Sequence, residues 1–153
     1  KNFKIHTKQN LPITIEEGWS FLSNPKNLST ITPDYMKFKI TDCDLKPVYQ
    51  GQIIQYMVRP IMNIPLKWVT EITHVVHEKY FVDEQRFGPY SLWHHKHFIK
   101  EIENGIEMED VIHYKIPGGI FGEFLNSLFI SKQLNEIFEY RKNKLIKIFG
   151  EIS

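Results

Sequence analysis

The sequence predicts an α+β fold in which a curved antiparallel sheet of about seven strands wraps around a long C-terminal helix. Residues 36–116 are rich in β-branched and aromatic side chains and are interrupted by turn residues, which is typical of about six strands joined as a meander. After Pro117-Gly118-Gly119 the apolar spacing changes to three, four and seven residues, which predicts one helix of about thirty residues. A strand and two short helices come before this region.

The N-terminal elements are predicted from local patterns. Phe3 and Ile5 alternate with polar neighbours, which indicates a first, half-buried strand. Thr14 is followed three residues later by Glu17, a capping-box pattern that begins a short helix. Asn24 precedes Pro25 and is a candidate N-cap for a second short helix.

Length and composition exclude several classes of protein. With 153 residues, the chain is expected to form one domain spanning 1–153. The 19 Lys and Arg nearly balance the 18 Asp and Glu, so we expect no nucleic-acid partner. The lone Cys43 cannot form an internal disulfide, which favours a reducing, cytoplasmic location. No apolar run approaches the ~18–20 residues of a membrane span, and the N-terminus lacks a signal-peptide core, so we expect no stable membrane insertion.

The predicted hairpin around Asn104-Gly105 decides which side chains share a face. Asn-Gly is a preferred two-residue type I′ turn, and this turn would place His97 opposite Ile112 and His95 opposite Tyr114. On that register one face of the hairpin points to the core. It carries Trp93, His95, His97, Ile99, Met108, Asp110, Ile112, Tyr114 and Ile116.

The other face of the hairpin meets solvent and includes His94 and His113, with Phe98 and Val111 as a candidate contact patch. An earlier strand has the same alternation. Its predicted inner residues are Leu66, Trp68, Thr70 and Ile72.

The stretch "WHHKHF" at 93–98 holds three of the seven histidines, and two of them, His95 and His97, are predicted to point inward with Asp110 and Tyr114. Buried polar groups cost roughly 1–3 kcal/mol each when unpaired, so such a cluster must bond within itself, to water or to a ligand. One interpretation is a hydrogen-bond network in a hydrated core, joined by Asp83 and Gln85.

Two further interpretations stay open. His95, His97, Asp110 and Tyr114 are candidate catalytic residues for acid–base chemistry. A metal site with Asp110 as the carboxylate is disfavoured, because no second carboxylate or third histidine clearly shares that face. We therefore expect no metal and no other cofactor.

Several strings resemble the helix-grip superfamily, which includes START lipid-transfer domains, the birch-pollen-allergen fold and polyketide cyclase/dehydrase-like proteins and is often called SRPBCC. They are "NLSTITPDYMKFKI" at 27–40, Trp68, "FVDEQRFGPYSLWHHKHF" at 81–98 and "DVIHYKIPGG" at 110–119, and they are most similar to the bacterial ligand-binding subgroup. The resemblance covers most of the chain. It implies an apolar cavity between the sheet and the terminal helix, although the fold does not imply one chemistry.

The leading functional hypothesis is therefore the binding of a small hydrophobic or amphipathic molecule, such as a lipid, a polyketide or an aromatic metabolite. The alternatives are a cyclase- or dehydratase-type enzyme and a regulatory or protein-interaction module, and a homodimer is compatible with each. The expected ligand-binding residues are Trp68, Trp93, His95, His97, Asp110, Ile112, Tyr114, Phe121, Phe124, Leu128 and Phe138.

Two smaller features have structural interpretations. Phe87 and Tyr90, around Gly88-Pro89, are candidates for the mouth of the pocket. Cations near the end of the helix, Arg141 among them, are expected to complement its dipole.

Overall fold

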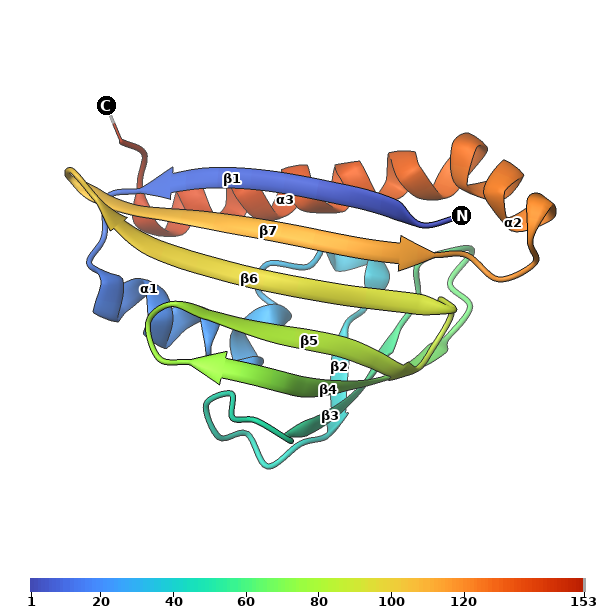
Figure 1. Ribbon diagram of the computed structural model, residues 1–153, viewed down its shortest axis with the longest axis horizontal. Coiled ribbons are helices and arrows are strands. Elements are labelled where there is room, and N and C mark those ends of the chain that lie inside the picture. The colour runs from blue at the N-terminus through green and yellow to red at the C-terminus, as the bar shows by residue number, and fades with distance from the viewer. Residues whose placement is uncertain (153) are drawn as a thin grey trace.

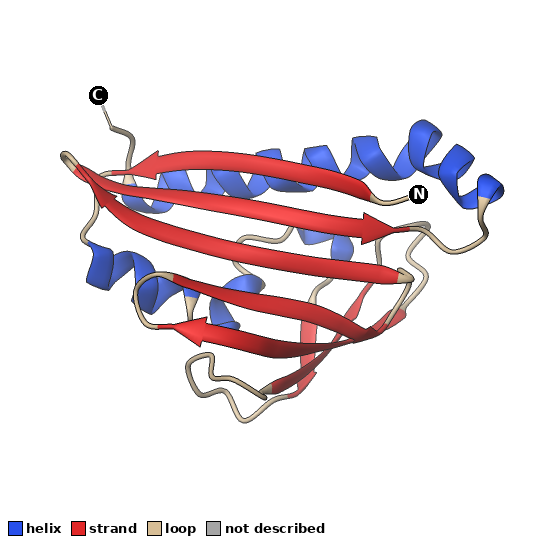
Figure 2. Ribbon diagram, in the orientation of Figure 1, coloured by secondary structure: helices blue, strands red, loops and turns tan. Residues whose placement is uncertain are grey.

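Seven antiparallel strands form one sheet in the computed structural model, which describes residues 1–152 (Figure 1). Their order across the sheet is β1-β7-β6-β5-β4-β3-β2, so only the first strand joins out of sequence order. The strands are β1 Phe3–Leu11, β2 Lys39–Asp42, β3 Ile53–Val58, β4 Leu66–Val76, β5 Tyr80–Phe87, β6 Leu92–Ile102 and β7 Gly105–Lys115. The predicted α+β fold class, with a sheet of this size, is confirmed (Figure 2).

The two short helices predicted after the first strand are confirmed. In α1, Ile15–Leu22, the Thr14 hydroxyl oxygen accepts a hydrogen bond from the backbone N–H of Glu17 at 3.1 Å, as a capping box requires. Asn24 caps the 3-10 helix η1, Pro25–Leu28, in the same way, and a further short turn, η2, spans Asp34–Met36. Gly18 lets α1 pack closely on the sheet, because a Cβ there would lie 2.5 Å from the Ile106 side chain.

The C-terminal helix is helical throughout residues 120–149, as predicted, but its turns are not uniform. It consists of α2 Ile120–Leu125, the π-turn η3 Asn126–Ile130 and α3 Ser131–Phe149. A π-turn inserts an extra residue and so rotates the residues before it relative to those after it. The apolar stripe predicted along the helix therefore does not stay on one face.

Three of the expected ligand-binding residues on this helix are exposed. Phe121, Phe124 and Leu128 are 67%, 57% and 50% exposed, and in Figure 1 α2 extends past the end of β7. By contrast, α3 turns Leu134 and Leu145 into the core, where both are buried.

The register predicted for the β6–β7 hairpin is wrong by two residues. Ile102 pairs with Gly105 and His97 pairs with Asp110, so Glu103 and Asn104 form the loop. Only Asn104 of that pair has a positive φ, 67°, whereas a type I′ turn needs two such residues. Gly105 belongs to the strand instead. This strand position requires glycine, because a Cβ there would lie 2.1 Å from the carbonyl oxygen of Leu11 in β1.

The two-residue shift leaves the assignment of faces intact, since side chains alternate with a period of two. The inner positions predicted on β6 and β7 are all buried, and on β4 Trp68, Thr70 and Ile72 are buried and Leu66 is partly so. Phe98 and Val111 on the outer face are half-buried, and the Phe98 ring lies 5.8 Å from that of Tyr80.

We expect Gly105→Ala to lower the free energy of unfolding by about 1–3 kcal/mol, because the Leu11 carbonyl must move to accommodate the new methyl group. Glu103→Ala in the adjacent exposed loop should change it by less than about 0.5 kcal/mol. Urea unfolding of both variants measures the difference. Equal values for the two would show that the close approach of β1 is relaxed in solution.

The interior divides into two apolar clusters. We call the first the α1 cluster; it lies under α1 and includes Trp19, Phe81, Ile99, Ile106 and Leu145. The second, which we call the aromatic cluster, lies toward the α2 end and includes Trp68, Trp93, Tyr114, Ile112 and Leu134. Among residues 1–152, no helix is long and apolar enough to cross a membrane.

Candidate functional site

Five buried or nearly buried ionisable side chains meet on the inner face of the sheet, and we call this group the polar belt. Asp83 comes from β5, His95 and His97 from β6, Asp110 from β7 and Arg141 from α3. Strand alternation explains the placement of the first four, since each lies on the core side of its strand. The belt adjoins both apolar clusters: the His97 ring stacks on Phe81 at 4.1 Å between centroids, and the His95 ring meets Phe138 edge-on at 5.9 Å.

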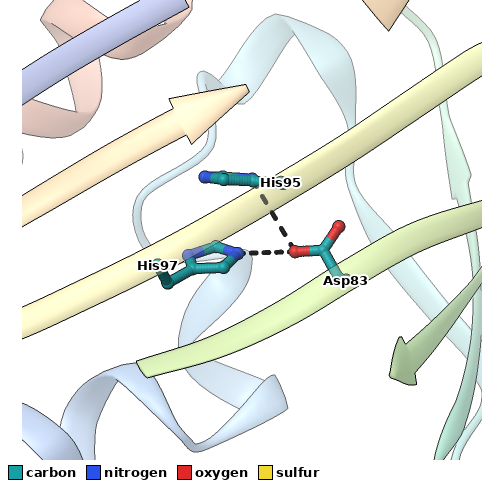
Figure 3. A group of neighbouring side chains, drawn as sticks. All are labelled: Asp83, His95 and His97. Carbon is teal, nitrogen blue, oxygen red and sulfur yellow. Dashed lines mark hydrogen bonds and ion pairs between the residues drawn. The ribbon is translucent and has the colours of Figure 1, made fainter. Parts of the chain in front are cut away.

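The two imidazoles stack on each other, with centroids 3.6 Å apart (Figure 3). Each bonds to the carboxylate diagonal to it in the sheet: His97 Nε2 lies 2.5 Å from Asp83 Oδ2, and His95 Nε2 lies 2.7 Å from Asp110 Oδ1. Each also faces the carboxylate directly across, with His95 Nδ1 at 3.7 Å from Asp83 Oδ2 and His97 Nδ1 at 3.4 Å from Asp110 Oδ1.

Arg141 completes the belt from the helix side. Its Nη1 lies 3.8 Å from Asp110 Oδ1, and the residue is only 8% exposed. Arg141, which was expected only to complement the helix dipole, therefore faces the interior. It lies three residues after Phe138 and four before Leu145, which is the spacing of the inner face of α3.

Burial and charge set the protonation of the belt. Burial, with the charge of His95, lowers the pKa of His97 from 6.5 to about 4. Burial alone would raise the pKa of Asp110, but the charge of Arg141 and the hydrogen bond from His95 outweigh it, so this pKa is held well below its usual value. The pKa of Asp83 is lowered in the same way, since the charge of His95 and the hydrogen bond from His97 outweigh the effect of burial. Both carboxylates are therefore ionised and His97 is neutral near pH 7.

Tyr114 does not join the belt by any hydrogen bond recorded within residues 1–152. Its hydroxyl donates to Asn126 Oδ1 at 2.8 Å, which ties the π-turn to β7. Both residues are buried. Gln85 is also elsewhere: it bonds the backbone N–H and carbonyl of Tyr90 and so closes the turn between β5 and β6.

The aromatic cluster collects many of the predicted apolar contact residues. The Trp68 ring lies 5.3 Å from Trp93 and 5.7 Å from Tyr56, and the Tyr90 ring lies 4.9 Å from Trp93. Ile112 is fully buried in the same cluster. The indole Nε1 of Trp68 is buried without a hydrogen-bond acceptor within residues 1–152. Phe87, expected with Tyr90 at a pocket mouth, is 61% exposed.

Packed rings therefore line the region where the sequence predicts a cavity. Two grooves among the described residues lie elsewhere and do not open between the sheet and the helix. One, of about 510 Å³, lies on the outer side of the helix between Ser127 and Glu139. The other, of about 560 Å³, lies beside the edge strand β2 and includes Phe38 and Leu45.

Sequence reasoning identified His95, His97 and Asp110 correctly as neighbours, and it named Asp83 only as an addition to the network. It missed Arg141 and Asn126. The position of Arg141 in the inner spacing of α3 is a signal that could have found it. No sequence signal marks Asn126, since its burial depends on the π-turn.

Comparison with solved structures gives a clear result for the whole architecture. Protein CV1439 from Chromobacterium violaceum has a TM-score of 0.74 at 10% identity, covering 98% of this chain and 99% of that one. TTHA0849 from Thermus thermophilus scores 0.67 at 13% identity, covering 95% and 99%, and Ara h 8.0201 scores 0.62 at 8% identity, covering 96% and 99%. The chain has the helix-grip fold.

At these identities the helix-grip likeness establishes the fold and nothing about the ligand or the chemistry. No protein-family model matches this sequence, and no curated protein matches it. The function must therefore be argued from the side chains of this chain.

Proposed function

We propose that the protein binds a small hydrophobic or amphipathic molecule at the aromatic cluster, between the sheet and the C-terminal helix. The observation that carries this proposal is the cluster itself: packed aromatic rings surround a buried indole N–H that has no acceptor within residues 1–152. A buried donor without a partner costs free energy that a polar atom of a ligand would recover. A flat molecule with one polar group, such as an aromatic metabolite or a polyketide, matches this chemistry best.

Entry to the cluster is proposed to occur at the π-turn. The segment 120–130 carries Phe121, Phe124, Leu128 and Phe129 on its exposed surface, so few of its apolar side chains anchor it to the core. The Tyr114–Asn126 hydrogen bond holds it to the sheet. Local opening of weakly packed segments costs less free energy than global unfolding. This segment is therefore the part of the C-terminal helix that can move away from the aromatic cluster.

Trp fluorescence tests this proposal, because the three tryptophans divide between the clusters. Trp68 and Trp93 lie in the aromatic cluster and Trp19 in the α1 cluster. We expect 1-anilinonaphthalene-8-sulfonate to quench the emission of a Trp19→Phe variant saturably. A Trp68→Phe/Trp93→Phe variant lacks the two indoles of the proposed site and reports on Trp19 alone, so it should bind the dye more weakly and be much less quenched.

Two further measurements complete the test. Asn126→Ala should speed the association of the dye, since it removes the hydrogen bond that holds the segment 120–130 to the sheet. Native mass spectrometry of gently purified protein should show a co-purifying small molecule. Equal quenching of both tryptophan variants would contradict the proposal, because it would indicate non-specific binding to the surface.

An acid–base enzyme is the second candidate, favoured by the His95–Asp110 and His97–Asp83 pairs. A neutral His97 paired with a carboxylate could act as a base. Binding is better supported, because both imidazoles are less than one-tenth exposed and already bonded within the belt. A turnover assay on an identified ligand, with His97→Gln and Asp110→Asn, separates the two functions.

A further inference from the structure

We propose that Asp83, His95 and His97 bind a divalent transition-metal ion and that Asp110 orients the two imidazoles around it. This goes beyond the proposed function, because the belt would hold the ion whether or not the aromatic cluster takes a ligand. It also reverses the sequence-based expectation of no metal, which considered Asp110 and not Asp83 as the carboxylate ligand.

The geometry of the three residues suits one ion. One donor atom from each lies within 4.8 Å of the others (Figure 3). Metal–nitrogen and metal–oxygen bonds of about 2.0–2.2 Å place two ligands of one ion roughly 3–4.3 Å apart. Shifts of about 1 Å, together with a rotation of the stacked rings, whose planes are 25° apart, therefore bring Asp83 Oδ2, His97 Nε2 and His95 Nδ1 into a single coordination sphere.

The protons of the belt give an independent reason. In the form with two neutral imidazoles each ring has one N–H, and the shortest contacts assign it to Nε2 in both rings: toward Asp83 from His97 and toward Asp110 from His95. Each Nδ1 then presents a lone pair to a carboxylate oxygen, at 3.7 Å from Asp83 and 3.4 Å from Asp110. In that form both contacts are repulsive. His97 Nδ1 is in addition buried without a hydrogen-bond partner within residues 1–152.

A metal ion removes both repulsive contacts at once. With the ion on His97 Nε2 and His95 Nδ1, the protons reside on His97 Nδ1 and His95 Nε2, and both of these atoms face Asp110 Oδ1. A carboxylate that accepts the second N–H of a ligating histidine is a recurrent device of metal sites. The alternative to a metal ion is a second proton on one of the two imidazoles. That proton would relieve only the repulsive contact made by its own ring.

The charges are arranged consistently with this assignment. Arg141 lies beside Asp110 and compensates its charge, which leaves the carboxylate of Asp83 for the ion. Two imidazoles and one carboxylate are a donor set for Zn²⁺, Fe²⁺ and Co²⁺ rather than for Ca²⁺ or Mg²⁺. Three protein ligands leave at least one coordination position for water or a ligand.

Titration of the chelator-treated protein with Co²⁺ tests the proposal, because bound Co²⁺ absorbs visible light and the spectrum reports on coordination. We expect one Co²⁺ per chain, displaced by Zn²⁺, and a rise in melting temperature with either ion. Asp110→Asn should weaken the affinity about 10–100-fold, as the loss of an orienting group does. Asp83→Asn and His97→Gln should weaken it at least as much.

The matched control is a His6→Gln/His94→Gln/His113→Gln variant, which removes histidines from the outer face of the same sheet. Its affinity for Co²⁺ should equal that of the wild type. Circular dichroism checks folding, and His97→Gln replaces Asp83→Asn if the latter does not fold.

If the wild type does not bind Co²⁺ stoichiometrically, the proposal is overturned without the need for any variant. The proposal is also overturned if the control variant loses Co²⁺ binding while Asp83→Asn retains it. The tryptophan quenching experiment, repeated on chelator-treated protein, tests ligand binding in the absence of metal. Its result therefore bears on the ligand-binding proposal alone.

Discussion

Replacing Asp110 by alanine is expected to lower the free energy of unfolding by about 3–5 kcal/mol, the largest effect of any single substitution considered for this protein. The variant leaves the Arg141 guanidinium buried without its carboxylate and removes the acceptor of the 2.7 Å hydrogen bond from His95. A buried charge that loses its partner retains the full cost of its removal from water. Urea unfolding in the presence of a chelator measures this effect without any contribution from metal.

Glu109→Ala is the matched control, because it alters the neighbouring residue on the opposite face of β7. Glu109 contacts His6 and Lys8 at the surface, where an ion pair is worth about 0–1 kcal/mol. We expect the loss to stay within that range. A similar loss in the two variants would mean that solvent reaches the belt and screens Asp110 as it does Glu109.

Acidification is expected to destabilise the metal-free protein strongly between pH 6.5 and about 4. The folded pKa of His97, about 4, lies below its unfolded value of 6.5, because burial and the charge of His95 oppose protonation. Between these values the unfolded chain binds a proton that the folded chain does not, so stability falls as the pH falls. One such proton corresponds to about 1.4 kcal/mol per pH unit, or roughly 3 kcal/mol over the whole interval.

The lowered pKa values of Asp83 and Asp110 have the same sign and extend the loss of stability to still lower pH. Urea midpoints measured at half-unit intervals give the slope. His97→Gln should flatten it between pH 6.5 and 4, whereas His94→Gln, on the outer face of β6, should leave it unchanged. If the slope is unaltered in His97→Gln, the proton that the unfolded chain binds between pH 6.5 and 4 belongs to another group.

The sequence allowed the inner and outer faces of the sheet to be predicted without knowledge of the register. His95, His97 and Asp110 were expected to face inward from a turn that proved to be displaced, and they do so because a shift of two residues preserves alternation. The pairing itself was wrong, since the close approach of Leu11 to Gly105 involves a strand nearly a hundred residues away in the chain.

The C-terminal helix illustrates the opposite case. Its extent follows from the spacing of its apolar residues, but the π-turn at Asn126–Ile130 changes the phase of that spacing, and Phe121, Phe124 and Leu128 are exposed. An irregular turn of this kind arises from the fit of a helix to the surface it covers, and the local sequence carries no separate signal for it.

By itself the sequence determined the α+β architecture, the order of its elements and the inward direction of two histidines and one aspartate, because these follow from periodicity along a single segment. Only the tertiary structure decided that Asp83 and Arg141 complete the belt, that Asn126 binds Tyr114, and that the aromatic rings pack together in one cluster. Those contacts depend on the relative position and rotation of elements distant in sequence, which are set by packing among all of them at once.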